Sequence, residues 1–534
     1  MTDAALVPGT RRRGRAWAVP QLGAMAAALC LAAACSGHPA PAASTPAVNS
    51  LTVKACTVAG QPARCGTLIV PEDRLTGTGR TIAVRLVVIP ATGPDRVPDP
   101  VVWFSGGPGG SAVDDIRAEM PLLAGLNGHR DLVFVEQRGT GSSNPLNCPV
   151  FSGSLADQPV MRASIQSCLA HLPGDLRFYT TAMYVDDVNQ LLGDLHYATA
   201  NFVGGSYGTD AEQVFLLRHP ARVRTMTLIS GSPLNIRLFD FWPGNSQLAL
   251  DYVLAQCQSQ PACQQAFPHL AADWAALWAA VGKSPVVLPA AQSPTKTTVR
   301  LDQDALASAM YNAMYTGDIS PIPVVVHTLA AAQNKVAALA TVISALATSS
   351  LLSPGPGSGI NQMILYEIQC TEPWQTLQPA ALADQRGSFY YQTALESAQL
   401  MQFICPLIPK SAAAAGQQQL PVSKVPVLAF NGPYDPRRAT AELGRGTAAL
   451  PRQPRHRAAR PGTPDRQQLL GHLRRPADPR VHRPGQRRPP EHRLPSRRPR
   501  PARRPDPAIT QAVCRHRKGS CGFRLPGPAR RHGP

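Results

Sequence analysis

The chain has 534 residues, is 44% hydrophobic and carries a formal net charge of +19 at pH 7. Residues 441–534 contain 23 Arg and one Lys against five acidic residues, so they account for the whole positive excess. Residues 1–440 are therefore charge-balanced and long enough to bury a sizeable core. This distribution argues against a globular body that recognises nucleic acid through its overall charge, and we expect no specific nucleic-acid partner.

The first 35 residues have the pattern of an export signal. Basic residues between Arg11 and Arg15 precede an apolar run over 16–34 and a small-residue stretch that ends on Cys35. This order resembles a bacterial lipoprotein signal, in which Cys35 is acylated and becomes the first residue. Simple secretion and an uncleaved membrane anchor are the alternatives. We expect an exported protein, either a cell-surface lipoprotein or secreted, with a lipid anchor as its membrane contact.

Residues 36–50 are rich in Pro, Ala and Ser, which is typical of a flexible tether.

Eight cysteines lie between the signal and the basic tail, an even number that agrees with export to an oxidising compartment. The sequence does not prove their connectivity, and buried free thiols are the alternative. The expected pairs are three local ones and one remainder: Cys56/Cys65, Cys148/Cys168, Cys257/Cys263 and Cys370/Cys405.

Residues 51–233 alternate between short apolar strand patterns and helical patterns. Such alternation predicts a mainly parallel, doubly wound α/β sheet. The expected strands are 81–90, 101–107, 131–139, 200–206 and 223–231, and the expected helices include 185–195 and 210–219.

The pattern then changes to long Ala-, Leu- and Gln-rich helical stretches over 234–420, which predict a helical cap inserted into the sheet domain. A buried strand returns within 425–436, so residues 421–440 are expected to complete the core and to carry Asp435 in a loop. Residues 441–534 hold 17 Pro, one Phe and no Trp or Tyr, a composition that predicts disorder.

A candidate nucleophile lies in the stretch GGSYG. Ser206 is the central residue of a G-x-S-x-G motif that directly follows an apolar strand and precedes a helix. The flanking Gly204 and Gly208 permit the tight turn that lifts a serine hydroxyl clear of a sheet. The backbone N–H of Tyr207 is then placed to stabilise an oxyanion. Chance glycines around a serine are the alternative explanation.

Two further turns accompany this motif. The stretch FSGGPGGSA at 104–112 is expected to bring the backbone N–H of Gly107 towards the same oxyanion. The stretch DLVFVEQRGTGSS, with Gln137, Arg138 and Gly139, is expected to form a buried polar turn that supports the site. Ordinary surface loops are the alternative for both.

These three stretches, together with CGTLIVPEDR at 65–74 and VPVLAFNGPYDP at 425–436, resemble the exported tripeptidyl and prolyl aminopeptidase family of α/β-hydrolases. The resemblance covers about residues 50–440. It implies an α/β-hydrolase core with a helical cap, and release of short peptides or proline from free N-termini by a Ser-His-Asp triad.

Carried over to this sequence, the resemblance implies that Ser206 is the nucleophile, that Asp435 orients the histidine, and that Gly107 and Tyr207 form the oxyanion hole. Asp435 capping its own turn is the alternative for that residue. The family's oxyanion loop usually begins with histidine, whereas Ser105 stands there in this chain. Because the oxyanion donors are backbone groups, this departure is tolerable.

Enzymes of this kind bind the substrate's α-ammonium with carboxylates from the cap. The stretch YEIQCTEPW offers Glu367 and Glu372, of which Glu372 is the candidate, and a solvated surface acid is the alternative. The sequence shows no metal-ligand spacing and no nucleotide-binding loop, so we expect no cofactor. The expected partner is a peptide with a free N-terminus, and the expected oligomeric state is a monomer.

The catalytic histidine is the element that the sequence does not supply. In the family it follows the acid by some tens of residues, after one further strand, but here the Arg/Pro-rich tail begins within ten residues of Asp435. Six tail histidines, none in the family's surroundings, are His456, His472, His482, His492, His516 and His532. We interpret 441–534 as an out-of-frame product that has lost the histidine; a genuine polybasic tail that binds anionic polymers is the alternative.

The sequence therefore predicts an exported serine hydrolase, an aminopeptidase by resemblance, that is inactive in this version if the base is missing. The alternatives are a non-catalytic peptide- or surface-binding protein with a polybasic tail, and an esterase on the same fold.

Overall fold

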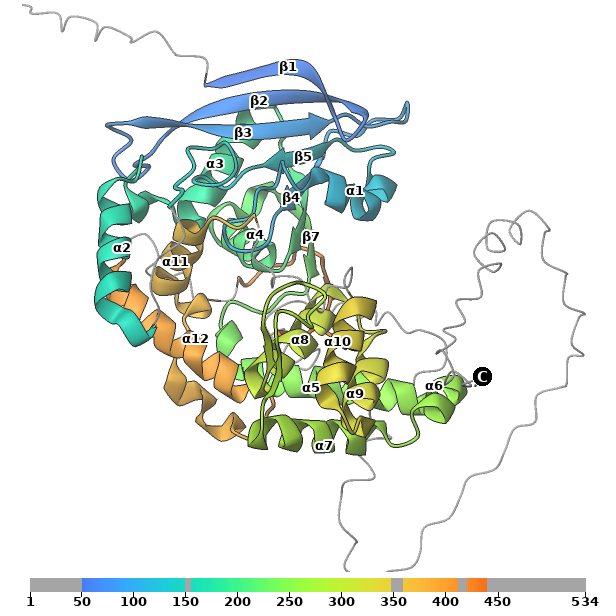
Figure 1. The fold of residues 1–534 in the computed structure, drawn as a ribbon. Coiled ribbons are helices and arrows are strands. Elements are labelled where there is room, and N and C mark those ends of the chain that lie inside the picture. The colour runs from blue at the N-terminus through green and yellow to red at the C-terminus, as the bar shows by residue number, and fades with distance from the viewer. Residues whose placement is uncertain (1–49, 149–154, 347–358, 412–418, 420, 439–534) are drawn as a thin grey trace, which may run out of the picture. The chain divides into compact units, whose positions relative to one another are not determined.

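The computed structural model describes residues 50–148, 155–346, 359–411, 419 and 421–438, all within one compact unit, Met1–Ala458 (Figure 1). The expected signal with Cys35, the tether and the expected disordered tail lie outside the described residues.

A single eight-stranded sheet forms the centre of the described chain, in the order β1-β2-β3-β5-β4-β6-β7-β10. The first three strands and the β3–β5 pair are antiparallel, whereas β5, β4, β6, β7 and β10 run parallel. The strands are β1 (Leu51–Val58), β2 (Gln61–Pro71), β3 (Thr81–Ile89), β4 (Val101–Phe104), β5 (Leu132–Val135), β6 (Ala200–Gly205), β7 (Val223–Ile229) and β10 (Val427–Phe430). Together they form the predicted, mainly parallel sheet of an α/β-hydrolase fold.

Alternation along β4 shows why the sheet is covered on both faces. Val102 and Phe104 point into the core made with α3 (Thr181–Asp194) and α4 (Tyr207–Arg218). Val101 and Trp103 point to the opposite face, where they pack with residues of α1 (Ile116–Leu123). Because successive side chains of a strand alternate between faces, an uninterrupted apolar run such as VVWF requires helices on both sides.

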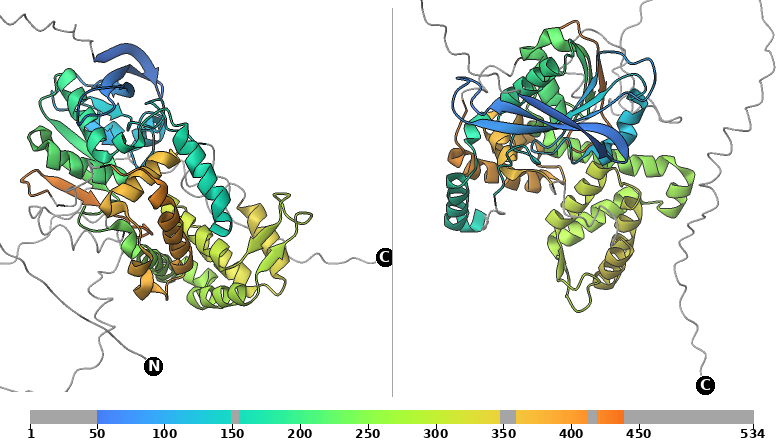
Figure 2. Two further views of the ribbon diagram at one scale, coloured as in Figure 1. Left: turned by 90° about the vertical axis from the view of Figure 1, so that its left-hand side faces the viewer. Right: turned by 90° about the horizontal axis from the view of Figure 1, so that it is seen from above.

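The cap lies between β7 and β10 and has a hydrophobic cluster of its own, in which Trp242, Trp274, Tyr311 and Tyr390 are buried. As predicted, it is mostly helical; the short antiparallel pair β8–β9 was not anticipated. Its main elements are α5 (Trp242–Ser259), α6 (Pro261–Ala266), α7 (Leu270–Lys283), β8 (Val286–Leu288), β9 (Val299–Leu301), α8 (Gln303–Thr316), α9 (Ile322–Ala331), α10 (Lys335–Ala345), α11 (Gln362–Thr371) and α12 (Tyr391–Ile404). Figure 2 shows these elements from two further sides.

Four of the short 3₁₀ turns lie in the core: η1 (Ala124–Leu126), η2 (Leu155–Asp157), η3 (Leu176–Phe178) and η4 (Pro220–Arg222). The other four follow β7: η5 (Leu238–Phe241), η6 (Pro373–Gln375), η7 (Pro379–Gln385) and η8 (Cys405–Leu407). The helix α2 (Gln158–Ala170) precedes α3.

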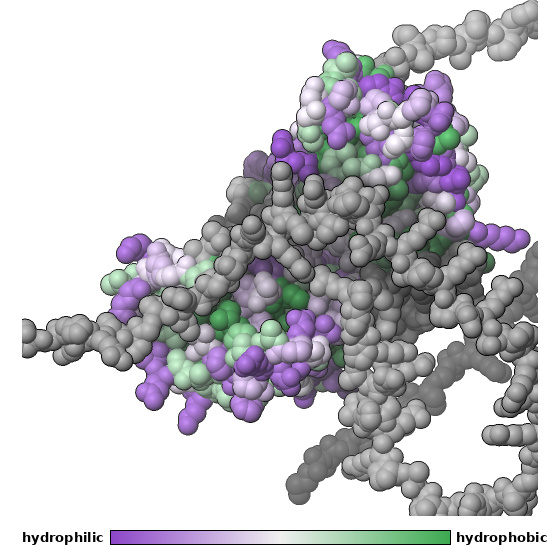
Figure 3. All heavy atoms as spheres, turned by 90° about the vertical axis from the view of Figure 1, so that its right-hand side faces the viewer, coloured by the Kyte–Doolittle hydropathy of each residue, from purple (hydrophilic) through white to green (hydrophobic). Residues whose placement is uncertain are grey.

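The four expected disulfides are confirmed: Cys56–Cys65, Cys148–Cys168, Cys257–Cys263 and Cys370–Cys405. No helix among the described residues is long and apolar enough to cross a membrane. On the face shown in Figure 3, hydrophilic and hydrophobic residues are interspersed over the described surface. The exposed large hydrophobic side chains are single residues of separate elements, which is normal for a folded protein.

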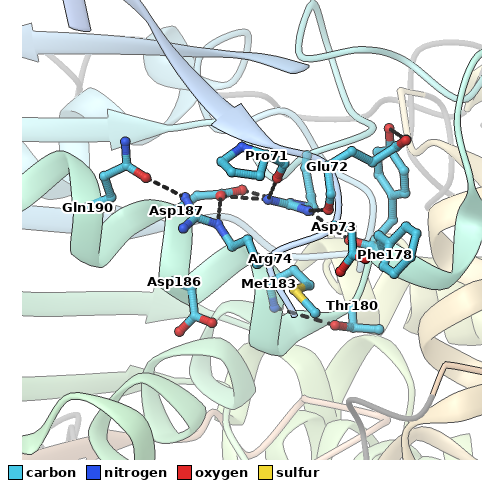
Figure 4. A network of polar contacts seen from close by, with 12 residues as sticks. Pro71, Glu72, Asp73, Arg74, Phe178, Thr180, Met183, Asp186, Asp187 and Gln190 are labelled. Carbon is cyan, nitrogen blue, oxygen red and sulfur yellow. Dashed lines mark hydrogen bonds and ion pairs between the residues drawn. The ribbon is translucent and has the colours of Figure 1, made fainter. Parts of the chain in front are cut away.

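The turn after β5 is buried, as predicted for the EQRGTGSS stretch. Arg138 is fully buried and donates two hydrogen bonds to Asp187 of α3, from Nε (2.8 Å) and Nη2 (2.6 Å). It also donates to the backbone carbonyls of Glu72 (2.7 Å) and Phe178 (2.9 Å). Arg74 donates to Asp187 as well, at 2.5 Å (Figure 4). The Arg138 guanidinium therefore joins three separate segments of the core.

Replacing Arg138 by Met should destabilise the protein by about 3–5 kcal/mol, because the Asp187 carboxylate would stay buried beside a single remaining arginine. The matched control is Arg177→Met, which breaks the exposed pair with Asp175 and should change stability by about 0–1 kcal/mol. Urea unfolding followed by circular dichroism measures both. Equal effects for the two substitutions would contradict the assignment of Arg138 as a central tie.

Candidate active site

Ser206 occupies a strained turn between β6 and α4, with φ 55° and ψ −122°. At this turn the backbone of α4 approaches β4 and β6 closely, and glycine at two positions allows it. A Cβ on Gly208 would lie 2.1 Å from the carbonyl oxygen of Phe104, and one on Gly204 would lie 2.5 Å from that of Gly208. Larger residues at either position would force the strand and the helix apart. The two glycines of the motif thus have the role that the sequence assigned to them.

The oxyanion loop passes directly beside this turn. A Cβ on Gly106 would lie 3.2 Å from Cβ of Ser206, and Gly107 has a φ of +118° that favours glycine. Tyr207 is the first residue of α4, where backbone N–H groups point out of the helix and attract negative charge. The structure therefore brings the loop with Gly107 to the Ser206–Tyr207 turn. The role of the two N–H groups as oxyanion donors stays a prediction.

Ser105, the first residue after β4, is buried. Its hydroxyl donates to Asp115 at 3.2 Å, and burial raises the pKa of that carboxyl. The Ser105 side chain thus ties the start of the oxyanion loop to the residue that precedes α1.

A chain of buried hydrogen bonds links the oxyanion loop to the cap. Gln137 accepts the N–H of Gly109 (3.3 Å) and donates to the hydroxyl of Tyr207 (3.3 Å). The Tyr207 hydroxyl lies 2.6 Å from that of Thr181, which donates to Glu372 at 2.6 Å. Because each polar group is buried, removing one would leave its neighbours without a partner. These hydrogen bonds to its side chain hold Tyr207, the residue that follows Ser206, in place.

Glu372 is fully buried, so the alternative of a solvated surface acid is wrong. One carboxylate oxygen accepts the backbone N–H of Thr181 (2.7 Å) and the other accepts its hydroxyl (2.6 Å), at the start of α3. Burial raises its pKa to about 8. Glu367, one turn earlier on α11, is also buried and has a pKa raised by burial. Binding of a substrate ammonium by Glu372 stays a prediction, and in this structure its two oxygens bind Thr181.

Asp435 lies in the loop after β10, at the same sheet edge as Ser206. Gly205 pairs with Ile229 of β7, which in turn pairs with Phe430 of β10. Neighbouring strands lie about 4.8 Å apart, so the ends of β6 and β10 are separated by about 10 Å. The carboxylate oxygen Oδ1 of Asp435 accepts the N–H groups of Arg437 (2.9 Å) and Arg438 (3.0 Å). Asp435 therefore caps its own turn, the alternative that the sequence left open. Its role in orienting a histidine stays a prediction.

The described residues do not supply the general base. Two of their histidines pair with carboxylates elsewhere: His219 with Asp186 at 2.8 Å and His327 with Asp273 at 2.7 Å. Within the described ranges, no hydrogen bond joins any histidine to Ser206 or Asp435. The tail histidines lie outside the described residues. The site in this structure thus consists of the Ser206 turn, the oxyanion loop within 104–112 and the loop that follows β10 at 431–438, which carries Asp435 and is called the acid loop below.

Sequence reasoning missed a buried polar cluster directly behind the nucleophile. Asp210, one turn into α4, is fully buried, and burial raises its pKa to about 6. Gln375 of the cap donates to it at 2.5 Å, and the guanidinium of Arg438 lies 4.0 Å away. The signal in the sequence was a charged residue four positions after Ser206 in a helix that is otherwise buried. Its partners lie more than 160 residues away and could not be identified from the sequence.

No three His, Cys, Asp or Glu side chains among the described residues gather as ligands for a metal ion.

Glu372 makes stability depend on pH. Its pKa rises from an unfolded value of about 4.5 to about 8, so the folded state retains a proton that the unfolded state has lost between these values. Stability should therefore fall as pH rises from about 5 to 8, by at most about 1.4 kcal/mol per pH unit for this group. Glu372→Gln keeps an acceptor for Thr181 and should flatten this slope.

Thermal unfolding of the wild type and of Glu372→Gln at several pH values measures the effect. Asp210 contributes a slope of the same sign below about pH 6, so the comparison uses the range from pH 6.5 to 8. An identical slope in the two proteins would show that Glu372 is not the titrating group.

Comparison with known proteins gives a family for the central region. A model of the α/β hydrolase fold family matches residues 99–278. This stretch contains the oxyanion loop, the buried turn after β5 and the Ser206 turn.

Several curated proteins are similar to parts of this chain. It is 27% identical over 238 residues to the serine protease Hip1 of Mycobacterium tuberculosis, covering 40% of this chain and 42% of that protein. It is 27% identical over 191 residues to a tripeptidyl aminopeptidase of Streptomyces coelicolor, covering 32% and 35%. A shorter match of 89 residues, 39% identical, links it to carboxylesterase B of M. tuberculosis and covers 16% of this chain and 17% of that protein. The chain thus spans less than half the length of the curated relatives it matches.

Solved structures are also similar in part. They include VinJ, with a TM-score of 0.23, 20% identity and coverage of 38% of this chain and 59% of that one. Another is the naproxen esterase of Bacillus subtilis, with a TM-score of 0.19, 19% identity and coverage of 32% and 44%. The family match over residues 99–278, the mainly parallel sheet and the Ser206 turn together show an α/β-hydrolase fold, and the curated relatives that are similar to parts of the chain include serine peptidases and a carboxylesterase.

Proposed function

We propose that the chain is an exported serine hydrolase that cleaves peptides near a free N-terminus through an acyl-enzyme on Ser206. The observation that carries this proposal is the Ser206 turn, held at φ 55° against the oxyanion loop. Such strain persists only where the surrounding structure imposes it, and it is typical of nucleophiles that must stand clear of a sheet. The four disulfides support export, since disulfides persist in oxidising compartments.

In the proposed reaction the Ser206 hydroxyl attacks the scissile carbonyl carbon while its proton passes to a general base. The N–H groups of Gly107 and Tyr207 stabilise the negative charge on the carbonyl oxygen. The bond to the leaving amine then breaks, the base returns the proton to that amine, and water hydrolyses the ester on Ser206. Asp435 orients the base, which must come from outside the described residues.

The proposed preference for a free N-terminus concerns the cap. It rests on the similarity to a tripeptidyl aminopeptidase and on buried cap carboxylates beside the core. For Glu372 to accept the substrate ammonium, the substrate would have to replace Thr181 as its hydrogen-bond donor. A nearby cation lowers the pKa of a carboxyl, but with a pKa of about 8, Glu372 is mostly protonated at neutral pH, so ammonium binding would require release of this proton and would strengthen as the pH rises towards 8.

Two alternatives have support of their own. The similarity to carboxylesterase B favours an esterase on the same fold. The lack of a histidine contact to Ser206 among the described residues favours a protein that binds peptides without cleaving them. In such a binding protein, residues 441–534 would act as a polybasic tail that binds anionic surfaces.

Fluorophosphonate labelling of the full chain tests the proposal. The wild type should be labelled and Ser206→Ala should not, because the probe reacts only with an activated serine. Tripeptide amides with free and acetylated N-termini, compared with a simple ester, then separate an aminopeptidase from an esterase. A folded wild type that stays unlabelled would reject the proposal, in favour of either the loss of the histidine expected for residues 441–534 or a protein that binds peptides without cleaving them.

A further inference from the structure

We propose that Arg437 and Arg438 are positioning residues that hold the Asp435 carboxylate in place by clamping the acid loop between the cap and the core. The consequence for catalysis rests on the proposed function, whereas the clamp itself does not.

The backbone of the acid loop is organised around Asp435. Its Oδ1 accepts the N–H groups of Arg437 and Arg438, so the carboxylate cannot rotate without releasing both. The side chain of Asn431 closes the loop from within. It donates to the carbonyls of Gly231 and Arg438 at 3.2 Å each and accepts the N–H of Gly231 at 3.1 Å. The position of the carboxylate therefore depends on where the two arginines lie.

Arg437 anchors the loop to the cap. Its guanidinium lies over three aromatic rings, at 5.3 Å from the centroid of Trp242, 5.8 Å from Tyr311 and 4.9 Å from Tyr315. Its Nε donates to the Tyr311 hydroxyl, and its backbone carbonyl accepts a hydrogen bond from Asn245 of α5 at 2.7 Å. Among the described residues it forms no ion pair with a carboxylate. The aromatic faces thus take the place of a counter-ion.

Arg438 anchors the same loop to the core. Its side chain is buried and donates to the backbone carbonyl of Ser230, which follows β7. It also lies 4.0 Å from Asp210 of α4, one turn after the nucleophile. Gln375 of the cap holds Asp210 at 2.5 Å. The acid loop and the nucleophile helix therefore share a buried charge cluster.

The side chain of Arg437 thus binds the cap and that of Arg438 binds the core, while the backbone N–H groups of both residues donate to the Asp435 carboxylate. A shift of the cap would pull Arg437 out of its aromatic setting, and a shift of α4 would displace Arg438. Either movement would disturb the hydrogen bonds to Asp435. We infer that the cap acts on the catalytic acid through Arg437, in addition to covering the site.

Hydrogen exchange of the full chain tests the clamp without requiring activity. In Arg437→Met the peptide containing the Arg437 and Arg438 amides should exchange about tenfold faster than in the wild type, while peptides from β6 and β7 stay unchanged. Arg437→Lys retains the cation over the rings and should restore much of the protection. Arg300→Met, which removes an exposed cap arginine paired with Asp302, is the matched control and should change nothing at the acid loop. Tyr311→Phe removes only the hydroxyl that accepts from Arg437 and replaces the Met variant if that variant does not fold.

Unchanged exchange at 437–438 in a folded variant would overturn the clamp. The catalytic consequence is tested by the rate of Ser206 labelling, which should fall about tenfold in Arg437→Met and recover in Arg437→Lys. Faster exchange with an unchanged labelling rate would overturn the positioning role. A wild type that is not labelled rejects the proposed function, and the exchange result still decides whether the clamp exists.

Discussion

The close approach of α4 to β4 is the constraint on which the rest of the site depends. Gly208 lies so near the carbonyl of Phe104 that no side chain fits between them, and Gly204 is enclosed in the same way by the first turn of the helix. With both positions restricted to glycine, the chain turns from strand to helix within one residue, and Ser206 takes a positive φ. The same approach places the oxyanion loop, which continues directly from β4, beside the serine.

Buried polar contacts then connect this turn to the cap at two places. Tyr207 is tied through Thr181 to Glu372, and Asp210 is tied to Gln375, three residues further along the cap. Groups buried at such a junction are costly to leave unpaired, so the contacts favour one arrangement of cap and core. The raised pKa values of Glu372 and Asp210 are the cost of this arrangement, since both carboxyls are kept away from water.

Patterns that are local in the sequence predicted most of the core. The expected strands and helices from β3 to α4 are present with ends shifted by a few residues, and so is β10, because a buried strand has a continuous apolar run and ends in turn residues. All four disulfides were anticipated from spacing and parity. The β8–β9 pair was missed because its strands are only three residues long. The burial of Glu372 was missed because Thr181, its partner, is 191 residues away and only the fold brings the two together.

We infer that the oxyanion loop and the Ser206 turn form one preorganised site, whose N–H groups donate to the negatively charged oxygen of a tetrahedral intermediate. A crystal structure of the full chain after reaction with a fluorophosphonate tests this most directly. We expect a phosphonyl group on Ser206 with one oxygen about 2.7–3.1 Å from the backbone nitrogens of both Gly107 and Tyr207. An adduct whose oxygens all point away from these two groups would contradict the claim.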